Sequence, residues 1–156
     1  MTLTQDHIEQ LRKSGLSDET MAAARLYSAN NTDVAEILGW QPKEYDWGSA
    51  VVIPYFEKDG TENCYKRVRL DFSRQRKGDK GIIKYESPLK SENRAYFPPG
   101  IGPALADTTV PLLITEGEKK SLKAVQDGFS CIGLPGVWGW QEKRRRDAHG
   151  RTFGAR

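Results

Sequence analysis

The fold is decided by residues 110–140, which read VPLLITEGEKKSLKAVQDGFSCIGLPGVWGW. The apolar run at 112–115 has the length and composition of a strand that is buried on both faces. A helical pattern starts at Glu118 and stops at Gly128, the position where a helix C-cap belongs. A second apolar run follows at 129–134. The pattern predicts strand, helix and strand, the βαβ unit of a parallel sheet, in a chain of α/β type that is α+β overall.

Glu116 is the chief candidate for a functional residue, because it follows the first predicted strand and precedes the helix. Ligands bind at this edge of open α/β sheets, and Gly117 allows a tight turn and a close approach of the ligand to the backbone. A carboxylate held there can bind Mg²⁺ or act as a general acid or base. A structural interpretation is also open, since Glu116 and Glu118 are acidic residues of a first helical turn, which the helix dipole favours.

Three short helices are predicted in residues 1–46. Thr2 or Thr4 caps the first and Ser17 the second, and a capping box that begins at Asp33 starts the third. Such helices could form a helix-turn-helix that reads DNA. However, this segment carries 4 Lys and Arg against 8 Asp and Glu, which favours a structural cap or a partner-docking surface over a polyanion contact.

The next segment alternates with a period of two and predicts a β-hairpin over residues 51–70 with a turn at Asp59-Gly60. Tyr65, Arg67 and Arg69 would share one face, which suits phosphate contacts and stacking on a base; an ordinary solvated face is the alternative. Residues 73–81 predict a mobile basic loop, 82–85 a short strand and 101–109 a connector.

The composition narrows the function classes. The net charge is +3, but residues 47–106 carry 11 Lys and Arg against 7 Asp and Glu, and residues 141–156 carry 6 against 2, so these two segments are the candidate polyanion surfaces. Cys64 and Cys131 are isolated, which argues against zinc and disulfides, and both histidines are expected on the surface. No apolar run has membrane-spanning length and no leader opens the chain, so we expect a cytoplasmic protein.

The order LLITEGEKKSLKA, then GFSCIGLPG, resembles the opening of a TOPRIM domain, the metal-binding module of primases and of type IA and II topoisomerases. The version with EKK and GLPGVWGW is most similar to the replication primases of phages and plasmids of the DUF3854 type. The preceding segments VIPYF, YKRVRL, KYESP and YFPPG follow their order in bacterial-type primases. The resemblance implies that Glu116 is a catalytic residue and metal ligand, with Glu118 as a second catalytic candidate. It also implies nucleic-acid or nucleotide contacts at Arg67, Arg69, Lys84, Arg94, Lys119 and Lys120.

On this resemblance the chain is a DNA-primase-type nucleotidyltransferase, which synthesises RNA primers on single-stranded DNA with Mg²⁺. Single-stranded DNA and NTPs would be its partners, together with a replication helicase or a second chain, and no membrane. The family's later Asp-x-Asp strand is absent, since only Asp147 follows residue 140 before the chain ends. The chain therefore resembles the N-terminal part of a primase that ends inside its TOPRIM domain, weakly active or inactive alone. The alternative is a non-enzymatic nucleic-acid-binding or regulatory protein derived from a primase.

The expected organisation has four segments. Residues 1–46 form a helical N-terminal region and residues 47–106 a basic strand-rich primase-like subdomain. Residues 107–140 form a partial TOPRIM βαβ unit, and residues 141–156 a basic tail in which 143–146 could contact DNA.

Overall fold

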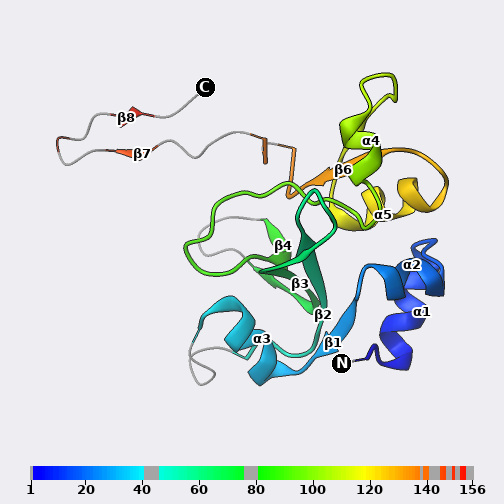
Figure 1. Ribbon diagram of the computed structural model, residues 1–156. Helices are drawn as coiled ribbons and strands as arrows, with labels where there is room; N and C mark the ends of the chain where they lie inside the picture. The colour runs from blue at the N-terminus through cyan, green and yellow to red at the C-terminus, as the bar shows by residue number, and fades with distance from the viewer. Residues whose placement is uncertain are drawn as a thin grey trace.

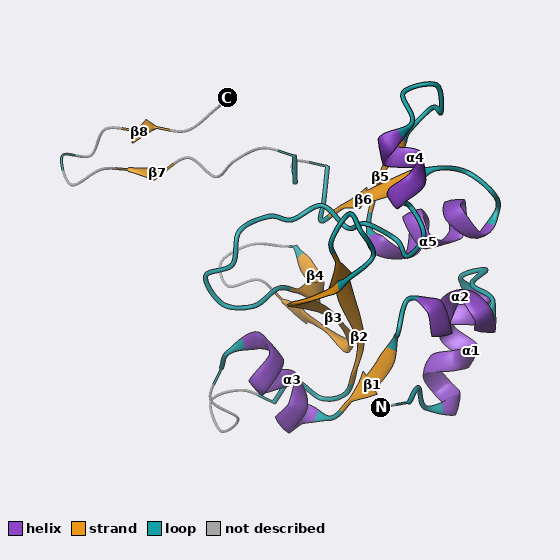
Figure 2. Ribbon diagram, viewed as in Figure 1, coloured by secondary structure: helices purple, strands orange, loops and turns teal. Residues whose placement is uncertain are grey.

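The computed structural model describes residues 2–40, 46–75, 81–137, 139–140, 145–146, 149 and 152–153. Its elements in chain order are α1 (Gln5–Lys13), α2 (Asp18–Ala23), β1 (Tyr27–Ala29), α3 (Asn31–Leu38), β2 (Ala50–Phe56), β3 (Glu62–Gln75), β4 (Ile82–Glu86), α4 (Gly102–Ala106), β5 (Leu113–Glu116), α5 (Glu118–Gln126), β6 (Cys131–Leu134), β7 (Arg145–Arg146) and β8 (Thr152–Phe153). β1-β2-β3-β4 form an antiparallel sheet, and β5 and β6 form a parallel pair (Figure 1). This mixture of helices and strands, shown in Figure 2, confirms the predicted fold class.

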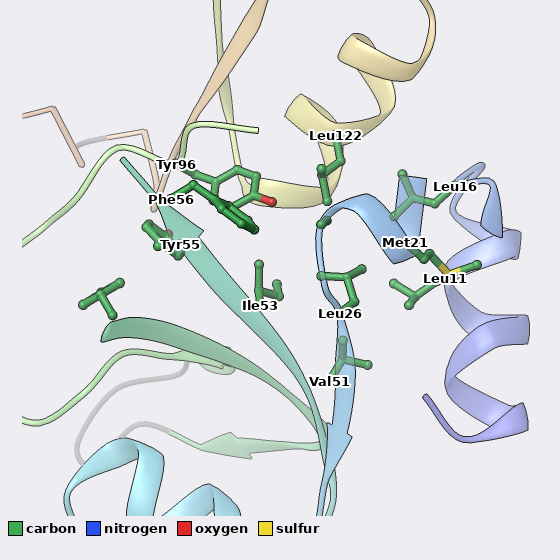
Figure 3. Close-up of a cluster of buried hydrophobic side chains, with 12 residues drawn as sticks. Leu11, Leu16, Met21, Leu26, Val51, Ile53, Tyr55, Phe56, Tyr96 and Leu122 are labelled. Atoms are coloured by element: carbon green, nitrogen blue, oxygen red, sulfur yellow. The ribbon is translucent and has the colours of Figure 1, made fainter. Parts of the chain in front are cut away.

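The antiparallel sheet is covered on both faces, and every residue of its strand β2 is buried. Val51, Ile53 and Tyr55 pack into one core cluster with side chains from α1, α2 and α5 (Figure 3). Ala50 and Val52 point to the opposite face, where a second cluster includes buried residues of α3. Because α5 contributes Leu122 to the first cluster, the parallel unit is packed onto the antiparallel sheet.

The predicted hairpin is confirmed, with Val52 opposite Val68 and Ile53 opposite Arg67. The predicted loop at 73–81 is wrong at its start, because β3 continues to Gln75. The reason is pairing: Gln75 lies opposite Ile82 on β4, so the backbone groups of a polar, basic segment are satisfied in the sheet. Residues 76–80 of that segment lie outside the described residues.

The N-terminal helices form as predicted, but the start of the third is corrected. Thr4 caps α1 and Ser17 caps α2. α3 begins earlier than predicted, because Asn30 is its N-cap and exchanges hydrogen bonds with Asp33 in a capping box. β1, which was not predicted, separates α2 from α3, and Met21 and Val34 belong to clusters on opposite faces of the sheet. The three helices therefore do not form one helix-turn-helix unit.

The parallel unit confirms the predicted βαβ topology, with Leu113 opposite Cys131 and α5 between the strands. The prediction that the first strand is buried on both faces is wrong: Leu113 and Ile114 are 47% and 63% exposed. Within the part of the chain that the structure describes, β5 pairs with β6 alone, and α5 turns Leu122 toward the antiparallel sheet instead. Residues 101–109, predicted as a connector, contain the short helix α4.

The prediction that both histidines lie on the surface is wrong for His7. His7 is not a surface residue: it is 5% exposed, with its Nε2 2.9 Å from Asp71 and its Nδ1 2.6 Å from the Ser28 hydroxyl. The His7 side chain therefore connects α1 to β1 and β3.

None of the helices in the described ranges is long and apolar enough to cross a membrane. Asp147 and residues 141–144 of the tail lie outside the described residues.

Candidate functional site

A cleft of about 750 Å³ lies between the antiparallel sheet and the start of α5. β3 and β4 contribute residues to one wall, and the end of β5 and the first turn of α5 contribute residues to the other. The cleft is lined by Arg67, Gly81, Ile82, Ile83, Lys84, Tyr85, Glu116, Gly117, Glu118, Lys119, Lys120 and Pro135. The lining thus holds four cationic and two acidic side chains drawn from segments far apart in the sequence.

Glu116 is the last residue of β5 and is exposed at the cleft. Gly117 follows with φ 88° and ψ 149° as the N-cap of α5, without a capping side chain, and its N–H donates to the Leu134 carbonyl at 2.8 Å. This backbone region is essentially restricted to glycine. The turn that brings the Glu116 carboxylate and the first N–H groups of α5 to the same opening therefore depends on the glycine.

Glu118 occupies a different environment, since it is 1% exposed. Its Oε1 accepts a hydrogen bond from Arg67 Nη1 at 2.5 Å and another from the Tyr55 hydroxyl at 2.7 Å. Burial raises the pKa of the Tyr55 hydroxyl, and the Glu118 carboxylate raises it further, so Tyr55 stays protonated and acts as a donor. Burial and the charge of Glu118 likewise raise the pKa of Tyr85.

The lysines give the rim of the cleft its positive charge. Lys84 on β4 and Lys120 on α5 are exposed, and Lys119 donates to the Ser14 hydroxyl at 2.9 Å. Burial lowers the pKa of Lys119, and the nearby charges of Arg69 and Lys84 lower it further. These cations are therefore close enough to repel one another, and a bound anion would relieve that repulsion.

The structure brings six of the residues singled out from the sequence to this cleft, namely Arg67, Lys84, Glu116, Glu118, Lys119 and Lys120. Arg69 lies beside it, where its Nη1 donates to Gln10 on α1. Arg94 is exposed and stacks over Tyr65 with its guanidinium carbon 5.0 Å from the ring centroid, and it does not line the cleft.

Sequence reasoning missed the partners that surround the predicted residues. Tyr55 and Tyr85 carried no local signal, because the contact of Tyr55 with Glu118 joins residues 63 positions apart. The ion pair of Arg67 with Glu118 spans 51 positions. Predicting that a buried carboxylate at a helix start meets an arginine on a strand requires the packing of α5 on the sheet.

The described residues do not assemble a complete Mg²⁺ site. Within them, no three His, Cys, Asp or Glu side chains come together as metal ligands. Glu118 is engaged by Arg67 and Tyr55, so Glu116 is the carboxylate that the cleft presents. Protein Mg²⁺ sites usually combine one or two carboxylates with substrate phosphates and water. One carboxylate is a partial donor set.

The comparisons with known proteins identify the fold. The catalytic domain of DnaG primase bound to ssDNA is similar to this chain, with a TM-score of 0.54 and 19% sequence identity over 88% of this chain and 50% of that one. The chain has a fold similar to that of the DnaG primase core. A second structure of the DnaG catalytic core matches with a TM-score of 0.52 and 19% identity, over 87% of this chain and 49% of that one. The chain thus spans about half the length of the DnaG domains that it matches.

The sequence comparisons add one match. The family described as a domain of unknown function, DUF3854, matches residues 104–154, which include β5, α5 and β6. No curated protein matches the chain. The match to DUF3854 includes the parallel unit, which is also where the sequence resembles the opening of a TOPRIM domain.

Proposed function

We propose that this chain is a primase-like replication protein whose cleft binds the phosphates of single-stranded DNA and of nucleotides. The observation that carries the proposal is the cleft itself, which Lys84, Lys119 and Lys120 line together with the exposed Glu116 at the end of β5. Clustered lysines and the N–H groups at a helix start attract phosphate. As a TOPRIM-containing replication primase of the phage or plasmid type, the protein would act in the cytoplasm.

In the proposed chemistry, the hydroxyl end of a primer attacks the α-phosphorus of an incoming nucleotide, and pyrophosphate leaves. Catalysis of such a step rests on positioning and on neutralising charge. Lys84, Lys119 and Lys120 would hold the phosphates, and Glu116 would accept the proton of the attacking hydroxyl or serve as the metal-linked carboxylate. Mg²⁺, where bound, supplies charge neutralisation at the phosphates.

A non-enzymatic binding or regulatory role is the second candidate. It is favoured by the absence, within the described residues, of a three-ligand acidic cluster. Such a protein would keep the cationic cleft and bind single-stranded DNA without transferring nucleotides. In both candidates the cleft binds phosphate, so a binding assay tests what they share and a synthesis assay separates them.

The binding test uses fluorescence anisotropy of a labelled oligo-dT strand over a series of salt concentrations. The Lys119→Ala/Lys120→Ala variant and Lys84→Ala should bind more weakly. The slope of log affinity against log salt should become shallower by about 0.7 for each DNA phosphate that the variant no longer neutralises. Lys58→Ala, which removes an exposed cation from the turn between β2 and β3, is the matched control. Equal weakening in the control would contradict the assignment of binding to the cleft.

The synthesis test follows labelled NTPs into primers on single-stranded DNA with Mg²⁺. Glu116→Gln should abolish any synthesis that the chain performs, whereas Glu36→Gln, an exposed change of the same kind on α3, should not. DNA binding without synthesis in the unmodified chain would favour the regulatory candidate. Synthesis that survives Glu116→Gln would contradict the role given to this residue.

A further inference from the structure

Glu118 joins the two walls of the cleft at its floor. It belongs to the first turn of α5, whereas its two partners come from the antiparallel sheet, Arg67 from β3 and Tyr55 from β2. Both donors meet the same oxygen, Oε1, at 2.5 and 2.7 Å. The carboxylate therefore fixes the position of the Arg67 guanidinium relative to the start of α5.

Arg67 keeps donor capacity beyond this ion pair. Its side chain is 8% exposed and lines the cleft, and its guanidinium carbon lies 5.5 Å from the centroid of the Tyr85 ring. Glu118 engages Nη1, while the buried Nε has no hydrogen-bond partner among the described residues. A guanidinium has five N–H groups in a fixed fork that matches a phosphate. It is thus held in place from one side with donors to spare.

We propose that Glu118 is a positioning residue: it holds Arg67 at the cleft floor so that the guanidinium donates hydrogen bonds to a bound phosphate group. In this role Glu118 neither binds a metal nor transfers a proton. The inference rests on the proposed function, because it assumes that the cleft binds phosphate. Holding a flexible arginine in its binding geometry before the ligand arrives lowers the entropic cost of binding.

Simple electrostatics predicts the opposite effect of Glu118, and this makes the inference testable. A carboxylate beside the cleft repels an anion, so its neutralisation alone should strengthen phosphate binding. If Glu118 positions Arg67, its neutralisation should weaken binding, because the guanidinium loses its charged partner and leaves its geometry. The sign of the change separates the two effects.

The experiment measures the binding of inorganic tripolyphosphate to the full chain by titration calorimetry, at low salt and without divalent cations. Glu118→Gln should weaken binding about tenfold, the effect expected for one hydrogen bond to a charged group. Tyr55→Phe removes one of the two donors to Oε1 and leaves the charge, so it should weaken binding by a smaller factor. Glu36→Gln is the control of equal charge change and should bind like the unmodified chain.

The paired variant Arg67→Met/Glu118→Met removes both charges, so it tests whether the ion pair serves only the fold. It should fold, as circular dichroism would show, and still bind tripolyphosphate at least tenfold more weakly. Unchanged or tighter binding by Glu118→Gln, or normal binding by the paired variant, would overturn the positioning role and leave the cleft as a phosphate site. If Glu118→Gln does not fold, Tyr55→Phe and the paired variant decide. No binding by the unmodified chain would overturn both the inference and the proposed function.

Discussion

The buried ion pair of Arg67 and Glu118 leads to a prediction about stability that can be worked from the structure. The two side chains are 8% and 1% exposed, and the same carboxylate oxygen also accepts from Tyr55. Removing one partner leaves the other as a buried charge without its solvation. Such truncations cost about 3–5 kcal/mol, whereas replacing both partners with apolar side chains of similar volume is often neutral.

The perturbations are Arg67→Met, Glu118→Met and the two together. Each single change should lower the free energy of unfolding by about 3–5 kcal/mol, roughly a fifth or more of the total of about 5–15 kcal/mol for a marginally stable domain. At about 2–4 °C for each kcal/mol in a chain of this length, the midpoint of thermal unfolding should fall by about 6–20 °C. The double variant should recover most of this stability, because no buried charge remains.

The assay is urea denaturation followed by circular dichroism and tryptophan fluorescence. Arg12→Met, which breaks the exposed pair of Arg12 with Asp18 on the surface, is the matched control and should change stability far less. The reasoning is refuted if the effects of the two single variants add in the double variant, since additivity would mean that the two charges are not coupled. It is also refuted if either single variant is as stable as the unmodified chain.

Three further predictions concern the turn, a helix cap and a lysine. Gly117→Ala should lower the free energy of unfolding, measured by urea denaturation, by about 1–3 kcal/mol; the cause would be backbone strain alone, since an added Cβ would meet nothing within 4 Å. Gly136→Ala, where an added Cβ also meets nothing within 4 Å, is the control. Equal effects of the two changes would contradict the strain argument. Asn30→Ala should cost about 1 kcal/mol because it removes the α3 cap, and an unchanged thermal midpoint would contradict this. Because the pKa of Lys119 is lowered from 10.5, Lys119 should lose its charge as the pH rises through an alkaline window below that value. The affinity of the chain for DNA should fall in this window. The Lys119→Arg variant should keep its DNA affinity there, because arginine remains charged. In the same window the free energy of unfolding should rise with pH, because the unfolded chain binds more protons than the folded one.

Much of the fold could be predicted from local patterns in the sequence. The period of two in the β2–β3 hairpin and the apolar runs around the Glu116-Gly117 turn were read directly from the sequence, since each depends on residues close together in the chain. Strand β1 was not predicted, because it has only three residues, the last with a small side chain, and these are too few to show the alternation of a strand. The start of α3 was misplaced because the capping box was predicted to begin at Asp33, whereas Asn30 is the N-cap, a position for which asparagine is as strongly favoured as aspartate.

The candidate site, too, could be predicted from the sequence only in part. The residue types that line the cleft were found from charge and from the resemblance to primases, because lysines, arginines and a carboxylate at a strand end stand out one by one. The side chains that they touch could not be found. Glu116 and Glu118 are two positions apart with the same side chain, yet one is exposed and the other 1% exposed, because the packing of α5 on Tyr55 and Arg67 selects which one is buried.

The most direct test of the central claim is to locate the DNA on the molecule. The ¹⁵N-labelled chain would be titrated with a short single strand of DNA, and the backbone amide shifts would be mapped by NMR. We predict that the largest shifts fall on residues 117–120 and on Lys84, with little change at α3 on the other face of the sheet. Shifts centred away from the cleft, or none at saturating DNA, would contradict the account.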